Sequence, residues 1–242
     1  MATDTEQVVG DGIAHGNAAW SFAGQTAAAF GDHVRRSVPM YDLGHELIAR
    51  LSDFFVRQDS YVYDVGTSLG GALEQVVERH GHQEGCSFVG IDTEPDMVRR
   101  ARDAFAAHRN VTIEEGDLLS YEFEKSDLII SYYCLQFMPP KHRQDAIDKI
   151  HEHLNWGGAF IWFEKVRGCD ARFQDIFSLL YVDYKLEQSY TPEEIVGKSR
   201  SLKGVLEPFS SEGNRALLER AGFLDTITVF KYLCFEGILA IK

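Results

Sequence analysis

A glycine-bearing turn and an acidic residue are the first features of the sequence that could do chemistry. The turn, residues 66–71 with the sequence Gly-Thr-Ser-Leu-Gly-Gly, follows a run of β-forming residues at 61–65. Glycine lets a backbone approach a ligand closely. Asp92 ends the next apolar run, where a carboxylate can accept hydrogen bonds from both hydroxyls of a ribose. Because the turn lacks the G-x-G-x-x-G fingerprint of dinucleotide sites, a nucleoside without phosphates fits better.

A second acidic residue follows the third predicted strand. Asp117 lies in the segment Glu-Gly-Asp-Leu at 115–118 and can accept a hydrogen bond from an adenine amino group. Leu118 can cover one face of the ring. The sequence therefore predicts a nucleoside site with the following members: Gly66, Thr67, Ser68, Asp92, Asp117 and Leu118.

The elements that must position these residues alternate between strands and helices. The predicted parallel strands are 61–65, 88–91, 111–113, 128–130 and 159–163, and the predicted antiparallel pair is 227–230 and 237–241. Helical spacing of apolar residues separates the parallel strands. We therefore expect an α/β fold with a seven-stranded, doubly wound, mostly parallel sheet of the Rossmann-like type and an antiparallel C-terminal hairpin.

The remaining segments fall outside this alternation. Residues 1–19 lack a periodic apolar pattern and are predicted to form a flexible tail, and 20–242 to form a single domain. Within that domain, 20–57 are expected to form a helical N-terminal segment. A helical insertion at about 169–215 is a candidate lid over the carboxyl ends of the strands.

Composition narrows the class of protein. The 242 residues are 45% hydrophobic, which is enough for a buried core, and carry a net charge of −13. This charge repels a nucleic-acid backbone, so we expect no direct nucleic-acid binding. The chain shows no run long enough to cross a membrane and no export signal, which predicts a cytoplasmic protein without a membrane partner. Its four cysteines show no metal-binding spacing, so no metal site is predicted.

Five motifs together resemble one family. They are Trp-Ser-Phe at 20–22, Arg-Ser-Val-Pro-Met-Tyr at 36–41, Tyr-Asp-Val-Gly-Thr-Ser-Leu-Gly at 63–70, Leu-Gln-Phe at 135–137, and Arg-Ser at 200–201. The chain is similar to the class I S-adenosylmethionine-dependent methyltransferases, and more narrowly to the carboxy-S-adenosylmethionine synthases of tRNA wobble-uridine modification.

The resemblance implies a ligand, a reaction and a set of site residues. S-adenosylmethionine (SAM) would bind against Tyr41, Gly66, Thr67, Ser68, Asp92, Thr93, Asp117, Leu118, Tyr132 and Gln136. Arg200 would hold the carboxylate that prephenate donates to the sulfonium methyl, a role that suits its planar charged fork. The family also implies a homodimer.

Two positions depart from the family's pattern. Thr93 and Tyr132 stand where the family has asparagine. An aromatic ring near a sulfonium offers cation–π attraction of about 0.5–2 kcal/mol, while the amide's hydrogen bonds are lost. We therefore assign Tyr132, with Arg200, to the catalytic group.

Several functions fit these residues. The leading hypothesis is carboxylation of SAM with prephenate or a related reaction at the sulfonium. The alternatives are methyl transfer to a small-molecule acceptor, intramolecular cyclisation of SAM that releases methylthioadenosine and azetidine-2-carboxylate, and a catalytically idle SAM-binding module. Besides SAM itself, the expected partner is prephenate or another small acid or amine.

Overall fold

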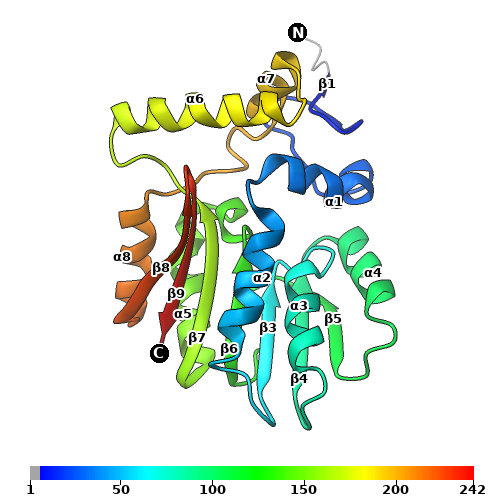
Figure 1. Cartoon of the computed structure of the whole chain (residues 1–242), viewed down its shortest axis with the longest axis vertical. Helices are drawn as coiled ribbons and strands as arrows, with labels where there is room; N and C mark the ends of the chain where they lie inside the picture. Colours follow the sequence, from blue (N-terminus) through cyan, green and yellow to red (C-terminus); the bar gives the residue numbers. More distant parts are fainter. Residues whose placement is uncertain (1–5) are drawn as a thin grey trace.

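A seven-stranded sheet forms the centre of the protein (Figure 1). The computed structural model describes residues 6–242. The strands of this sheet are β3 (Tyr61–Val65), β4 (Ser87–Asp92), β5 (Val111–Glu115), β6 (Ser126–Tyr132), β7 (Leu154–Lys165), β8 (Asp225–Tyr232) and β9 (Phe235–Ile241). Their order is β5-β4-β3-β6-β7-β9-β8, with β9 antiparallel to both of its neighbours. The predicted fold class is confirmed.

Helices cover both faces of the sheet. One face is covered by α2 (Tyr41–Ser52), α3 (Gly71–His80) and α4 (Pro95–Ala104), which pack against the sheet in one core cluster. The other face is covered by α5 (Arg143–His153) and α8 (Ser211–Ala221), which pack against it in a second core cluster. Successive residues of β3 alternate between these clusters, since Val62 belongs to the first and Tyr63 to the second. Both faces of the parallel strands are therefore buried.

The remaining elements gather at the carboxyl ends of the parallel strands (Figure 1). They are α1 (Gln25–Ser37), α6 (Ala171–Glu187), α7 (Pro192–Ser201), and the small hairpin of β1 (Gln7–Val8) and β2 (Ala14–His15). We call this group the cap. Two short 3-10 helices, η1 (Leu135–Phe137) and η2 (Pro140–His142), follow β6.

The N-terminal segment is more ordered than its sequence suggested. We predicted a flexible tail over 1–19, but β1 and β2 pair as a hairpin within it. Val9 and Ile13 are buried and form a small core with Trp20, and the hairpin packs against α7 within the cap. Residues 1–5 lie outside the described part of the chain.

The predicted insertion is shorter than 169–215. Its helices α6 and α7 end at Ser201, whereas α8 begins at Ser211 and belongs to the core of the sheet. Among residues 6–242, no helix combines the length and apolar character that spanning a membrane requires.

Candidate active site

A cavity of about 910 Å³ lies between the carboxyl ends of the parallel strands and the cap. Residues from β3, β4, β6 and β7 and the loops after them form its floor, and α1, α6 and α7 contribute its roof. Such a volume lies near the upper end of the range for small-molecule sites, about 300–1,000 Å³. The cavity therefore has room for more than one small molecule.

The glycine turn forms the cavity wall after β3. Gly66 has φ +73°, and a Cβ atom there would overlap the Cys134 side chain, so this position requires glycine. The amides of Gly66 and Thr67 both donate to the carbonyl oxygen of Ile91, at 2.8 and 3.0 Å. Ser68 also lies in the left-handed region, with φ 54°. These constraints fix the turn against the end of β4.

Asp92 is tied to this turn. Its Oδ2 accepts a hydrogen bond from the Ser68 amide at 2.8 Å, and its Oδ1 accepts one from the Glu94 amide at 2.9 Å. Burial raises the pKa of this carboxyl, although the amide hydrogen bonds oppose the shift. Each oxygen retains a lone pair, so the carboxylate can still accept from two ribose hydroxyls. Thr93 beside it is exposed and also lines the cavity.

The predicted adenine contacts lie beside Asp92. Asp117 is exposed at the cavity wall, where its Oδ1 accepts from the Leu119 amide at 2.8 Å. Leu118 is buried and offers an apolar surface to the same space. The structure brings both residues together with the glycine turn and Asp92.

Asp64 is a site residue that the sequence reasoning did not select. It is buried at the end of β3 and lines the cavity. Its Oδ2 accepts from the Thr67 hydroxyl at 2.7 Å, while its Oδ1 has no hydrogen-bond partner among residues 6–242. Burial, together with the negative charge of Asp92, raises its pKa to about 7. A buried carboxylate with an unused oxygen is suited to receive a ligand ammonium group.

Tyr132 and Tyr41 form an aromatic wall of the cavity. The Tyr132 hydroxyl donates to the Tyr41 carbonyl oxygen at 2.6 Å, and their ring centroids lie 5.0 Å apart. The His45 ring packs 4.6 Å from Tyr132. Burial lowers the pKa of His45 to about 4, so this imidazole is neutral at pH 7. The wall is therefore an uncharged aromatic surface, as cation–π contact with a sulfonium requires.

Gln136 lines the cavity but its amide is engaged by the protein. Its Nε2 donates to the Tyr133 carbonyl oxygen at 3.2 Å, and its Oε1 accepts from the Lys165 amide at 2.8 Å. The side chain thus ties the end of β6 to the end of β7. It positions Lys165 at the cavity wall.

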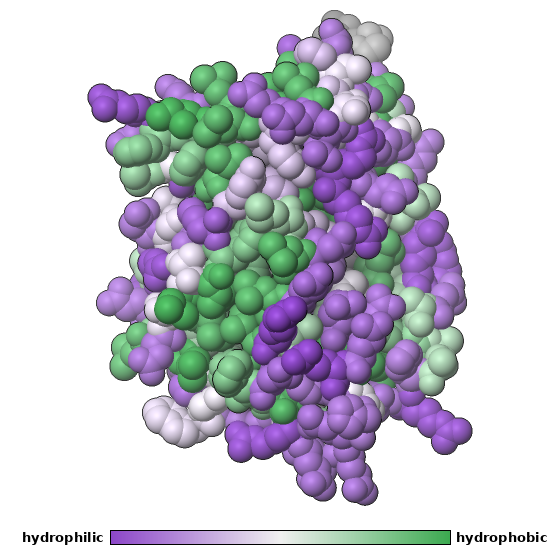
Figure 2. All heavy atoms as spheres, in the orientation of Figure 1, coloured by the Kyte–Doolittle hydropathy of each residue, from purple (hydrophilic) through white to green (hydrophobic). Residues whose placement is uncertain are grey.

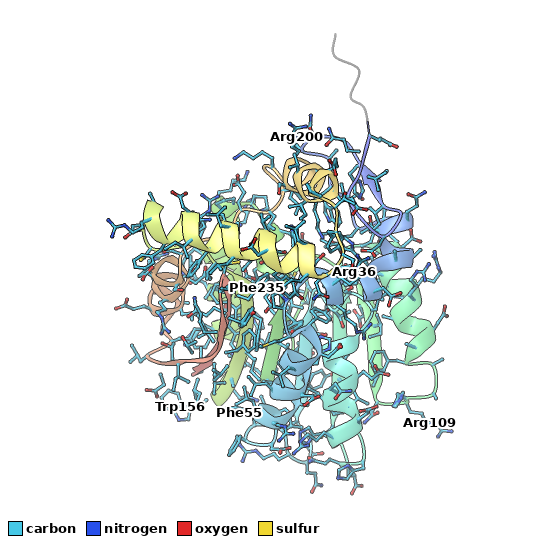
Figure 3. The ribbon with its side chains drawn as sticks, turned by 45° about the horizontal axis from the view of Figure 1, so that its top comes forward. Arg36, Phe55, Arg109, Trp156, Arg200 and Phe235 are labelled. Atoms are coloured by element: carbon cyan, nitrogen blue, oxygen red, sulfur yellow. The ribbon has the colours of Figure 1, made fainter. Side chains whose placement is uncertain are left out.

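The structure does not bring Arg200 to the cavity. Its side chain is exposed on the outer side of α7, as Figure 3 shows at the edge of the cap. Lys198, two residues earlier, is buried and lines the cavity instead. Residues two apart on a helix point in nearly opposite directions, so only one of this pair can face inward.

Three lysines line the side of the cavity away from the acids. They are Lys165 at the end of β7, Lys185 on α6 and Lys198 on α7. Within residues 6–242, no Asp or Glu forms an ion pair with any of the three. Because β6 separates β3 from β7, the cavity has an acidic side near β3–β5 and a basic side near β7.

The fold and the cavity together define the class of protein. The strand order, the glycine turn after β3 and the acids after β4 and β5 are those of a SAM-dependent enzyme with the methyltransferase fold. A family model described as a methyltransferase domain matches residues 62–158.

Similarity to curated proteins identifies the family. The chain is 37% identical over 227 residues to the carboxy-S-adenosyl-L-methionine synthase of Staphylococcus epidermidis, covering 92% of this chain and 97% of that protein. It is 34% identical over 226 residues to the synthase of the same name from Escherichia coli O1:K1 / APEC, covering 92% and 91%. The chain belongs to the carboxy-S-adenosyl-L-methionine synthase family.

Solved structures agree on the fold. Human N-acetylserotonin methyltransferase in complex with SAM superposes with a TM-score of 0.62 at 19% identity, over 90% of this chain and 55% of that one. An O-methyltransferase family protein from Burkholderia thailandensis gives a TM-score of 0.63 at 19% identity, over 90% and 60%. The fold of the present chain thus corresponds to 55–60% of the length of each of these longer proteins.

Proposed function

We propose that this enzyme carboxylates the methyl group of SAM, with prephenate as the carboxyl donor. The observation that carries the proposal is the division of charge within one cavity. The acidic side, with Asp64, Asp92 and Asp117, suits the ammonium and hydroxyl groups of a cationic nucleoside. The basic side, with Lys165 and Lys185, suits a carboxylated second substrate. The relatives are carboxy-S-adenosyl-L-methionine synthases, which supports the same reaction.

The reaction balances with these two substrates alone. The sulfonium methyl of SAM loses a proton, and its carbon bonds to the carboxyl carbon that prephenate releases. The prephenate ring loses this carboxyl group and its hydroxide and becomes aromatic, leaving phenylpyruvate. The hydroxide and the proton form water. SAM supplies an acidified methyl group, so the protein's part is to hold both molecules together and exclude water.

The cap supports a reaction between small molecules. Tyr181 of α6 lines the cavity, and its hydroxyl donates to the Ser37 carbonyl oxygen at the end of α1, at 2.7 Å. This contact joins two of the roof helices. A roofed cavity at the carboxyl ends of the strands is suited to prephenate, while a folded RNA would require an open surface.

One observation favours a second reaction, the intramolecular cyclisation of SAM. Tyr132 replaces the family's asparagine and, with Tyr41, gives the cavity an aromatic wall. Such a wall stabilises a sulfonium and excludes water. Both effects would help the amine of SAM to attack the γ-carbon of the same molecule. This reaction releases methylthioadenosine and needs no second substrate.

Product analysis tests both proposals. Purified protein is incubated with SAM, with and without prephenate, and the nucleosides are identified by mass spectrometry. Carboxylated SAM that forms only with prephenate is the expected result. Methylthioadenosine formed without prephenate would show that the enzyme cyclises SAM instead of carboxylating it. S-adenosylhomocysteine would show that it transfers the methyl group. Unchanged SAM in every mixture would contradict catalysis, and the protein would then be a SAM-binding module without activity.

We also propose that the protein is a homodimer. Apolar side chains lie along one stripe of α2, at Leu43, Leu47 and Leu51, and Leu43 is 50% exposed. Phe230 and Leu239, on β8 and β9, are only partly buried and pack against the same core cluster. We call these residues the apolar patch. Figure 2 shows hydrophobic side chains gathered in the middle of this face of the molecule. A contiguous exposed apolar surface is typical of a protein interface.

The cytoplasmic location stays part of the proposal. The four cysteines are free thiols, in keeping with a reducing compartment.

A further inference from the structure

Lys185 and Lys165 share one aromatic ring at the basic side of the cavity. The Nζ atom of Lys165 lies 4.2 Å from the centroid of the Tyr181 ring, and that of Lys185 lies 4.5 Å from it. Phe235 extends the same surface, beneath α6 in Figure 3. No hydrogen bond from either Nζ to a residue of 6–242 is formed, although Lys185 is only 5% exposed. The amino groups of both lysines therefore face the cavity with their N–H donors unused.

Lys198 is held beside them by a different set of contacts. Its Nζ donates to the Ser37 hydroxyl at 2.8 Å and to Nε2 of His33. The other ring nitrogen of His33 donates to Asp11 at 2.7 Å, which fixes a neutral imidazole with Nε2 as an acceptor. Burial and the charge of Lys198 lower the pKa of His33 to about 3, in keeping with this assignment. When Lys198 is protonated its Nζ has three donors, so one N–H remains for a ligand.

Clustered cations without counter-charges destabilise a folded protein. Burying an unpaired ammonium costs several kcal/mol, and nearby like charges add to that cost. Such an arrangement is retained where a ligand supplies the missing negative charge. The Tyr181 and Phe235 rings add an apolar surface between the charges, which a compact hydrated anion such as phosphate would leave unused.

We propose that Lys165, Lys185 and Lys198 form the binding site for an organic dicarboxylate with an apolar body, and that binding takes up a proton. The inference rests on the proposed function, because the occupant would be the carboxyl donor. It assigns to these three lysines the carboxylate-binding role that the family resemblance implied for Arg200.

Proton uptake follows from the pKa values of the lysines in the free protein. Burial and the charge of Lys165 lower the pKa of Lys185 to about 7, and burial also lowers those of Lys165 and Lys198. A bound carboxylate favours the charged form and raises the pKa of Lys185 again. Above pH 7 the site must therefore bind a proton with the ligand. The titratable groups that face Lys185 from the surrounding elements are Lys165, Tyr181, Lys198, Cys234 and His33 of α1. Asp11 acts on this group through Lys198, whose pKa its charge raises.

Calorimetry tests the site without turnover. The protein is first saturated with S-adenosylhomocysteine and then titrated with three anions in separate experiments. Benzylmalonate has two carboxylates and a ring, and 3-phenylpropionate has a ring and one carboxylate. Inorganic phosphate is the third anion. We expect benzylmalonate to bind at least tenfold more tightly than either other anion. Its affinity should fall nearly tenfold per pH unit above pH 7. Titrations in Hepes and Tris at pH 8 should show uptake of about one proton, which largely disappears at pH 6. Equal affinity for all three anions would overturn the inference.

Matched variants separate binding from folding. Lys185→Met and Lys165→Met should each weaken benzylmalonate binding at least tenfold, whereas Lys141→Met, at an exposed lysine outside the cavity, should not. Removing a buried unpaired charge should leave the melting temperature of the first two variants unchanged or higher. Unchanged benzylmalonate binding in both variants would contradict the proposed site.

Two further outcomes distinguish this inference from its alternatives. If the lysine variants lose affinity for S-adenosylhomocysteine but not for methylthioadenosine, the lysines bind the amino-acid carboxylate of SAM, and the inference fails. If benzylmalonate binds through the lysines but no carboxylated SAM forms, the proposed function fails while the dicarboxylate site stands.

Discussion

The Tyr132 hydroxyl donates a 2.6 Å hydrogen bond to the Tyr41 carbonyl oxygen, which joins the end of β6 to the first residue of α2. Gly44 makes this contact possible, because a Cβ atom at that position would overlap the Tyr132 hydroxyl. The aromatic wall of the cavity therefore depends on a glycine within a helix. A side chain at that position would push Tyr132 away from Tyr41 and into the ligand space.

Gly44→Ala tests this dependence. Alanine in a helix normally stabilises by about 0.5–1 kcal/mol relative to glycine. We expect the opposite here, a lower melting temperature and at least tenfold weaker SAM binding, measured by thermal unfolding and calorimetry. Gly31→Ala in α1 is the matched control for stability, since its nearest neighbours lie 3.4 Å or more away. A Gly44→Ala protein as stable as the Gly31→Ala protein would show that Tyr132 is not confined in this way.

Asp64→Asn should have opposite effects on stability and on binding. Because the pKa of Asp64 is raised to about 7, its ionised form destabilises the free protein above the ordinary carboxyl pKa near 4. Asparagine keeps an acceptor for the Thr67 hydroxyl, so the melting temperature of the free variant at pH 8 should rise. SAM affinity should fall about 10–100-fold, since a hydrogen bond to a charged group contributes about 1.5–3 kcal/mol.

The pH dependence of SAM binding provides the second measurement on Asp64. Below pH 7 the wild-type carboxylate takes up a proton, so SAM affinity should fall as the pH is lowered. The Asp64→Asn variant should lack this slope, and Asp103→Asn, at an exposed position of α4, should retain it. The same slope in all three proteins would remove Asp64 from the site.

Leu43→Glu should dissociate the dimer. A charge in the centre of a buried apolar interface is strongly unfavourable, because it loses water without gaining a partner. We expect the wild-type protein to sediment as a dimer at micromolar concentration and the variant as a monomer with an unchanged melting profile. Leu224→Glu is the control, since Leu224 is 85% exposed and lies outside the apolar patch. A monomeric wild-type protein would contradict the proposal directly.

The sequence predicted the acidic side of the cavity better than the basic side. Asp92 and Asp117 come directly after strands, and the carboxyl ends of parallel strands must meet at one edge of the sheet. Strand order therefore placed these residues without knowledge of any side-chain contact. Asp64 carried the same signal, as an acid at the end of β3, and could have been selected on that ground.

The basic side depends on helix orientation, which residue spacing alone does not set. Lys198 and Arg200 lie on opposite sides of α7, and only the packing of the cap decides which of them faces the cavity. Lys185 lies on α6, whose outward side also carries exposed apolar residues such as Leu179, so hydrophobic periodicity gives no clear inward face. The hairpin was missed for a related reason, because Val9 and Ile13 form too short a pattern to detect.

Asp11 links the β1–β2 hairpin to Lys198 through His33. Its carboxylate accepts hydrogen bonds from His33 at 2.7 Å and Tyr190 at 2.9 Å, and it pairs with Arg36. Burial opposes ionisation of Asp11, but the hydrogen bonds from His33 and Tyr190 outweigh it, and its pKa is lowered. Its contribution to stability is therefore present above pH 4 and lost as the pH falls through the lowered pKa.

Asp11→Asn should loosen the cap at neutral pH. An amide cannot replace a carboxylate that accepts from three partners, and we expect a loss of about 1.5–3 kcal/mol. The melting temperature at pH 7 should fall by several degrees, and limited proteolysis should cut within 1–40 sooner than in the wild-type protein. Asp32→Asn, at an exposed residue of α1, is the matched control. Because the wild-type protein loses the same interaction in acid, the gap between wild type and Asp11→Asn should narrow below pH 4. A constant gap in melting temperature from pH 7 to pH 3 would mean that the charge of Asp11 does not hold the hairpin against α1.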